Sequence, residues 1–239
     1  MTASLHRLKP AAAPDPGSGI RGIVGVEDLQ RLANLAVTRT VRPGQGFIVE
    51  GDPADCFFNI TCGTAKLFKL LPDGRRQIIG FATAAHFLGL AVSGRYIFGA
   101  EAIDTVRLCR FSRTRLRLLL DEFPSLGRSL LDAASAELVA AQDQMLLLGR
   151  KTARERVASF LMEMSRQPDC GTGGSDLAGL RVPLPMHRLD IADYLGLTIE
   201  TVSRMLTRLC REGLISIPTT TAVLLRDPTR LQAVADGLG

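Results

Sequence analysis

The segment from His187 to Pro218 constrains the fold of this chain more than any other, because its small and apolar residues fit two short helices meeting near a right angle. Ala192 falls where two such helices come closest, so a larger side chain would push them apart. Gly196 follows the first helix and can take the left-handed conformation that reverses the chain. Thr198 is placed to cap the next helix. The segment therefore predicts a helix-turn-helix that binds DNA.

The second of these predicted helices has an apolar face and a polar face at helical spacing. The apolar set is Val202, Met205, Leu206 and Leu209, which would pack against Ile191 and Leu195 of the first helix. Recognition helices read base edges with their N-terminal residues, arginine binding guanine and carboxylates binding cytosine. We therefore expect base contacts from Glu200, Ser203 and Arg204. The later residues Thr207, Arg208 and Arg211 are expected to contact phosphate.

The polar face has an alternative interpretation. Glu200 and Arg204 are four residues apart and could form an ordinary ion pair on the helix surface, which would stabilise the helix by about 0.2–0.5 kcal/mol. The downstream sequence favours DNA binding instead. Gly213–Ile217 and Ala222–Leu225 flank a Pro-Thr-Thr-Thr turn, which predicts the hairpin of a winged helix. The dipeptide Asp227-Pro228 then matches the cap and first residue of a closing helix.

The stretch Gly196-Leu-Thr-Ile-Glu-Thr-Val-Ser-Arg204 resembles the recognition segment of the CRP/FNR family of bacterial transcription regulators. Its Glu-x-x-Ser-Arg pattern is similar to the FNR and FixK branch. The resemblance implies a homodimer that binds double-stranded DNA at palindromes with TTGAT-like half-sites, with RNA polymerase as a partner. Glu200 and Arg204 would then read the guanine pair, and Ser203 a neighbouring thymine. Ile199 stands where the CRP pattern has a base-contacting arginine, so a CRP half-site is not expected.

Composition is compatible with this interpretation. The chain has 239 residues and a net charge of +5, which suits a polyanionic partner and allows two modest domains. Neither a bilayer-spanning apolar run nor a signal peptide is evident, so we expect a cytoplasmic protein with no membrane association. The five cysteines lack the spacing of a disulfide framework or a zinc site.

The N-terminal half predicts β-structure. Residues 1–20 are rich in Pro, Gly and Ala and are expected to form a flexible arm. Between Val37 and Phe111, short β-prone runs over residues 47–49, 56–61, 65–71, 77–81 and 105–111 alternate with turns such as Arg42-Pro-Gly44, Cys62-Gly63 and Pro72-Asp-Gly74, which indicates an antiparallel roll. The roll, over residues 21–122, resembles the cyclic-nucleotide-binding jelly roll of the same family. The expected fold class is therefore α+β.

A long helix is predicted from Asp121 to about Gly149 and assigned to residues 123–150. Its apolar residues recur at steps of three and four, the pattern of a heptad seam that needs a partner. The seam comprises Leu131, Ala134, Leu138, Ala141, Met145 and Leu148. We expect it to form a dimer interface, the alternative being that it packs on the chain's own roll. Residues 151–239 would form the winged helix-turn-helix domain, beginning with a hinge at Lys151–Arg156, a helix to about Arg166 and a loop over residues 168–179.

The residues of the roll that would bind an effector differ from those of two branches of the family. Cyclic-nucleotide-binding relatives hold phosphate with a Gly-Glu pair and an Arg-Ser or Arg-Thr pair, but this chain has Phe87-Leu-Gly-Leu90 and Tyr96–Ala102 there. Arg95 is the one nearby arginine that a shifted loop could supply. The iron–sulfur branch uses N-terminal cysteines, and none precedes Cys56. We therefore expect no cofactor, and an activator in oxygen- or redox-linked gene control like FixK; the alternative is a regulator gated by a cyclic nucleotide or by haem.

Two further switches are considered. Cys210 lies between Arg208 and Arg211, whose positive charge would lower the pKa of its thiol, and it is a candidate redox switch. A small, half-buried apolar role is the alternative. His6 and His86 could ligate haem, although a lone histidine in a roll is more often a hydrogen-bonded loop residue.

An enzyme is not expected. A metalloenzyme on a small antiparallel roll needs several histidines and a carboxylate that converge on one metal. His6, His86 and His187 are the only histidines and are widely scattered. Neither a nucleophile–base set nor a phosphate-binding loop is present, so no catalytic or metal-ligating residue is assigned.

Overall fold

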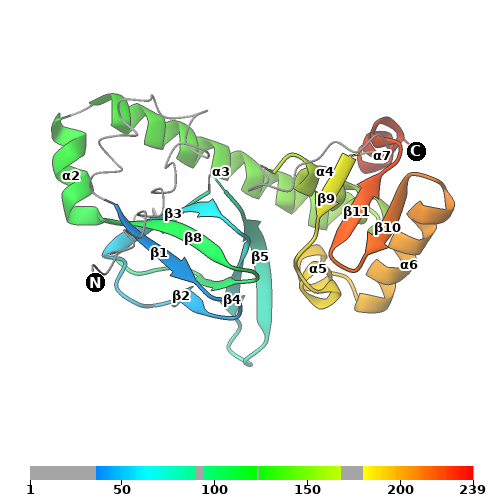
Figure 1. Ribbon diagram of the computed structural model, residues 1–239, viewed down its shortest axis with the longest axis horizontal. Helices are drawn as coiled ribbons and strands as arrows, with labels where there is room; N and C mark the ends of the chain where they lie inside the picture. The colour runs from blue at the N-terminus through cyan, green and yellow to red at the C-terminus, as the bar shows by residue number, and fades with distance from the viewer. Residues whose placement is uncertain (1–35, 85, 90–93, 123, 168–179, 239) are drawn as a thin grey trace, which may run out of the picture.

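The computed structural model describes residues 36–84, 86–89, 94–122, 124–167 and 180–238. The predicted arm at residues 1–20, the loop over residues 168–179, and His6 lie outside these ranges. Figure 1 shows a β-roll at one end of the molecule and a mixed α/β unit at the other, with a long helix extending from one to the other. This arrangement confirms the predicted α+β class and the order of its three parts.

The roll consists of two four-stranded antiparallel sheets, ordered β1-β8-β3-β6 and β2-β7-β4-β5. Their strands are β1 (Val37–Val41), β2 (Gly46–Ile48), β3 (Cys56–Cys62), β4 (Ala65–Leu70), β5 (Arg76–Ala82), β6 (Phe87–Leu88), β7 (Gly99–Ala102) and β8 (Val106–Ser112). β2, β3, β4, β5 and β8 match predicted runs. β1, β6 and β7 were not predicted. β6 has two residues and β7 is Gly-Ala-Glu-Ala, so both give weak patterns, whereas four of the five residues of β1, Val-Thr-Arg-Thr-Val, are β-branched and were a usable signal.

Apolar side chains fill the space between the two sheets. Ile60 and Leu108 are fully buried there, and Phe47 and Phe58 meet edge to face with ring centroids 5.7 Å apart. The Tyr96 hydroxyl donates to the carbonyl oxygen of Cys56 over 2.8 Å, which satisfies the polar end of a buried ring. The roll therefore has an apolar interior.

One turn of the roll requires glycine. Gly63 follows β3 with φ of 87°, in the left-handed region. A Cβ atom added there would lie 2.4 Å from the carbonyl oxygen of Thr105 and 2.8 Å from the Cα atom of Val106. Both the backbone conformation and the neighbouring backbone therefore exclude a side chain at this predicted turn.

The single helix predicted from Asp121 is wrong in its start. Asp121 and Glu122 end a separate helix, α2 (Arg113–Glu122), and the long helix α3 (Pro124–Arg150) begins at the proline. Pro124 is favourable at a first helical position because its missing N–H would have had no partner there. The α2 helix itself was not predicted.

The face of α3 that carries the seam does not pack on the roll. Leu131, Leu138 and Met145 are 67%, 61% and 66% exposed, respectively. Ala134 and Ala141 are also exposed, and Leu148 is 37% exposed. The alternative that this face covers the chain's own roll is therefore wrong for these residues.

The predicted hinge at Lys151–Arg156 is mostly helical. Only Lys151 and Thr152 separate α3 from α4 (Ala153–Ser165). The Thr152 hydroxyl accepts from the backbone N–H of Glu155, and the Glu155 carboxylate accepts from the N–H of Thr152, at 3.4 and 3.0 Å. This capping box starts the helix at once and shortens the hinge to two residues.

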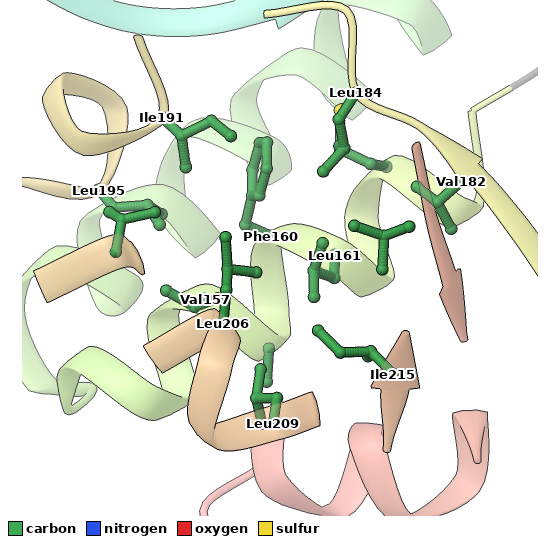
Figure 2. Close-up of a cluster of buried hydrophobic side chains, with 14 of the residues drawn as sticks. Val157, Phe160, Leu161, Val182, Leu184, Ile191, Leu195, Leu206, Leu209 and Ile215 are labelled. Carbon is green, nitrogen blue, oxygen red and sulfur yellow. The ribbon is translucent and has the colours of Figure 1, made fainter. Parts of the chain in front are cut away.

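The C-terminal unit combines helices with a three-stranded antiparallel sheet of order β10-β11-β9. Its remaining elements are β9 (Leu180–Pro183), α5 (Arg188–Leu195), α6 (Ile199–Arg211), β10 (Ile215–Thr219), β11 (Ala222–Leu225) and α7 (Pro228–Ala235). Figure 2 shows Phe160 and Leu161 of α4 pointing into a cluster shared by the two following helices and the sheet. Asp227 caps α7 by accepting from the N–H of Arg230, as predicted. The β9 strand was not predicted.

The roll contacts the first helix of the helix-turn-helix directly. Phe81 of β5 packs edge to face on Tyr194 of α5, with ring centroids 5.3 Å apart. Lys66 of β4 is only 14% exposed and forms ion pairs with Asp190 of α5 at 3.2 Å and with Glu101 at 3.1 Å. These contacts hold α5 against the roll.

A partly buried acid lies where α4 meets α5. The Tyr194 hydroxyl donates to Glu163 Oε2 over 3.1 Å. Burial raises the pKa of the Glu163 carboxyl, although this hydrogen bond and the charges of His86 and Arg166 oppose the shift, and Asp143 adds to it. Ionising Glu163 therefore costs more free energy in the folded state than in the unfolded chain.

This cost predicts a pH-dependent effect of Glu163→Gln. A carboxyl whose pKa is raised in the folded state stabilises the fold at low pH. This contribution to the free energy of unfolding is lost as the pH rises from the ordinary pKa of the carboxyl, near 4.5, through its folded pKa. Glutamine does not titrate, so the free energy of unfolding of the variant should improve relative to the parent between about pH 5 and about pH 8. Urea unfolding at both pH values measures this. The exposed Asp121→Asn is the control, and a difference that does not change with pH would contradict the prediction.

Candidate nucleic-acid interface

The turn between α5 and α6 has the geometry that the sequence predicted. Gly196 ends α5 in the left-handed conformation, with φ of 61° and ψ of 41°. Thr198 caps α6, its hydroxyl accepting from the backbone N–H of Thr201 at 3.2 Å. Ala192 is 1% exposed at the contact between the two helices. These features fix α6 as the outer helix of a helix-turn-helix.

The apolar and polar sides of α6 separate cleanly. Val202, Leu206 and Leu209 are buried, and Met205 is partly buried against the same core. The structure brings the six predicted DNA-contacting residues together on one exposed surface of α6. They are Glu200, Ser203, Arg204, Thr207, Arg208 and Arg211, and all are exposed.

Glu200 and Arg204 do not form the pair that the structural alternative required. Among the ion pairs of the described residues, none joins these two side chains. Arg204 instead donates from Nη2 to the hydroxyl of Thr201 at 3.3 Å. Hydrogen bonds from the Glu200 backbone and from the Thr198 side chain lower the pKa of the Glu200 carboxyl. Both groups therefore carry their charge on the outer face.

Arg208 has a partner within the protein. Its Nε donates to Glu212 Oε1 over 2.9 Å, while Arg154 of α4 donates to Glu212 Oε2 over 2.7 Å. Hydrogen bonds and charge from Arg154 and Arg208 lower the pKa of Glu212. Glu212 was not assigned a role from the sequence, although its spacing of four residues from Arg208 was a usable signal.

The wing differs in detail from the prediction. β10 begins at Ile215 instead of Gly213 and continues through Pro218 to Thr219, so the turn is formed by Thr220 and Thr221. Pro218 can lie within the strand because β10 is an edge strand, which leaves one side without ladder partners. Arg226, just after β11, donates from Nε to the hydroxyl of Ser216 over 3.0 Å.

Cys210 packs partly against the hydrophobic core of the C-terminal unit. Burial raises the pKa of its thiol, which is opposite to the lowering predicted from Arg208 and Arg211. The electrostatic reason for a redox switch is therefore wrong, and the position agrees with the small apolar role.

The candidate effector residues of the roll are engaged by the backbone. Arg95 donates from Nη1 to the carbonyl oxygen of Gly51 over 2.6 Å. The Nδ1 atom of His86 accepts from the backbone N–H of Thr83 over 3.2 Å, as expected of a hydrogen-bonded loop residue. Within the described ranges, no three His, Cys, Asp or Glu side chains converge as metal ligands, and no helix is long and apolar enough to span a membrane.

Comparisons with known proteins agree with this architecture. Residues 155–234 match the model of the Crp-like helix-turn-helix domain, and residues 38–123 match that of the cyclic nucleotide-binding domain. The chain is 46% identical to the nitrogen fixation regulation protein FixK of Bradyrhizobium diazoefficiens, over 91% of this chain and 90% of that protein. It is 43% identical to the transcriptional activatory protein AadR of Rhodopseudomonas palustris, over 92% and 90%.

A solved structure is similar along most of the chain. FixK2 from Bradyrhizobium japonicum superposes with a TM-score of 0.75 at 36% identity, covering 83% of this chain and 96% of that one. The sequence resemblance, the domain matches and the fold therefore agree with one another. The chain is a DNA-binding transcription regulator of the CRP/FNR family, in its FixK-like branch.

Proposed function

We propose that this protein is a homodimeric activator that binds palindromes with TTGAT-like half-sites through α6. The observation that carries the proposal is the exposed row of Glu200, Ser203 and Arg204 near the start of a helix whose opposite face is buried. Arginine can bind both acceptors of guanine, and a carboxylate accepts from the amino group of the paired cytosine. Arg204 and Glu200 together therefore suit one guanine–cytosine pair, and Ser203 suits a neighbouring thymine.

The remaining polar residues of α6 support a role on the phosphate backbone. Thr207 and Arg211 lie further along the same exposed surface, where a recognition helix leaves the groove. Arg208 belongs to this set, and its hydrogen bond to Glu212 holds its guanidinium in one position. These three residues would add affinity without distinguishing sequences.

The exposed seam of α3 supports a dimer. Large apolar side chains at successive heptad positions are costly in water, and a second copy of α3 would cover them. A two-fold dimer also presents two recognition helices to half-sites about 34–36 Å apart. We assign the sensor roll to residues 21–122, the dimerisation helix to 123–150 and the DNA-binding domain to 151–239, with RNA polymerase as the partner in activation.

The resemblance to the FixK branch leads us to propose a place in oxygen-linked control. The relatives include a nitrogen fixation regulation protein and the transcriptional activators FnrL and Anr. The sequence has no cysteine before Cys56 to hold an iron–sulfur cluster. The roll interior is occupied by its own side chains. These observations favour control through the amount of the protein, with an oxygen-responsive system upstream.

Arg204→Ala and Arg211→Ala should separate base reading from phosphate binding. Loss of Arg204 should cost about 1–3 kcal/mol on a TTGAT palindrome and remove the preference for its guanine. Loss of Arg211 should weaken binding to every duplex and reduce the salt dependence. Fluorescence anisotropy at several salt concentrations, with cognate, guanine-substituted and CRP-type palindromes, measures both effects. Equal losses on all duplexes for both variants would refute the role assignment.

Leu138→Glu should dissociate the dimer. Two-fold symmetry would bury two unpaired carboxylates in one seam, at a cost of about 3 kcal/mol, which raises the dimer dissociation constant roughly a hundredfold. Sedimentation velocity over a concentration series measures this. Val139→Glu is the matched control, because Val139 is similarly exposed but lies about 100° further around α3. A dimer that survives Leu138→Glu, or is lost equally with Val139→Glu, would contradict the seam.

A further inference from the structure

Arg204 is held at the start of α6 and does not pair with Glu200. The two residues are four apart, the spacing at which helix residues usually form an ion pair. Arg204 instead donates from Nη2 to the hydroxyl of Thr201 over 3.3 Å.

The two threonine hydroxyls also contact each other. Thr198 Oγ1 and Thr201 Oγ1 lie 3.0 Å apart, at hydrogen-bonding distance. Thr198 Oγ1 additionally accepts from the backbone N–H of Thr201 at 3.2 Å, which is the helix cap. The hydroxyl of Thr198 is therefore held in place by the start of the helix itself.

The direction of the first hydrogen bond follows from its donor. A guanidinium can only donate, so Arg204 donates to the Thr201 hydroxyl. Either threonine hydroxyl can donate to the other. Arg204, Thr201 and Thr198 therefore form a row of hydrogen bonds that ends at the cap of the helix.

These hydrogen bonds orient Arg204 without neutralising its charge. A direct pair would bind the guanidinium to the carboxylate and leave fewer groups for the base edges. In the arrangement seen here, Arg204 uses one of its five donors, and the rest of its guanidinium stays available. Preorganised side chains lose less freedom on binding, which strengthens discrimination between sequences.

We propose that Thr201 is a positioning residue for sequence specificity, whose hydroxyl holds the Arg204 guanidinium and is itself held by contact with the Thr198 hydroxyl. This inference rests on the proposed base-reading function of Arg204. The Thr198 hydroxyl also caps α6, so its removal would disturb the helix. Thr201 contributes only its backbone N–H to the cap, and its hydroxyl can therefore be tested separately.

The test replaces the Thr201 hydroxyl with a methyl group of similar size. Thr201→Val should reduce the ratio of cognate to guanine-substituted binding about fivefold, the worth of one net hydrogen bond. Thr201→Ser, which keeps the hydroxyl, should restore the ratio. Thr229→Val is the matched control, because Thr229 is an exposed threonine in the first turn of α7 and is not part of α6. Anisotropy titrations measure the ratios, and thermal melting confirms that each variant is folded.

A double-mutant cycle with Arg204→Ala distinguishes failure of this inference from failure of the proposed function. We expect Thr201→Val to have little further effect once Arg204 is absent. If Arg204→Ala loses discrimination and Thr201→Val retains it, Thr201 does not position Arg204. If Thr201→Val weakens all duplexes equally, its hydroxyl contacts phosphate and the proposal is overturned. If Arg204→Ala itself keeps full discrimination, the base-reading function is wrong.

Discussion

Burial of the apolar side of α6 is the interaction on which the DNA-reading surface depends. Val202, Leu206 and Leu209 insert into a core built around Phe160 and Leu161 of α4, as Figure 2 shows for the labelled members. Burying each such side chain contributes about 1.5–3 kcal/mol. Because side chains on a helix repeat every 3.6 residues, fixing these three also fixes the direction of every polar residue on the opposite side. The reading surface is thus set by packing that never contacts DNA.

The same core extends into the roll, which ties the helix-turn-helix to the N-terminal half. Ile78 and Phe81 of β5 belong to the cluster that contains Phe160 and Tyr194. The ion pairs of Lys66 with Asp190 and Glu101 lie beside it. Nearly buried ion pairs add little net stability, because desolvation offsets their attraction, but breaking one leaves an unpaired charge. These ion pairs therefore determine where α5 lies on the roll and add little to the free energy of unfolding.

Local signals in the sequence predicted the parts of the fold that local interactions determine. Gly196 and Thr198 mark the turn and cap of the helix-turn-helix because their conformations depend on adjacent residues. Features that depend on distant partners could not be predicted. β9 is a strand because it pairs with β11 some forty residues later, and its own sequence Leu-Arg-Val-Pro gives a weak pattern. The bond between Lys66 and Asp190 joins residues 124 apart in sequence, which no spacing rule detects.

The short hinge and the broad contact between roll and α5 bear together on how the protein is controlled. Only Lys151 and Thr152 could bend, and Arg156 fixes them further, since it donates to the carbonyl oxygens of Lys151, Leu148 and Leu195. A rotation of the DNA-binding domain relative to α3 and the roll would break the bond from Arg156 to Leu148, expose the Phe81–Tyr194 contact and leave Lys66 without Asp190. An effector in the roll would have to supply that free energy, and apolar side chains already occupy the roll interior. The physical cost of moving α6 therefore supports the proposal made above that the protein is controlled through its amount.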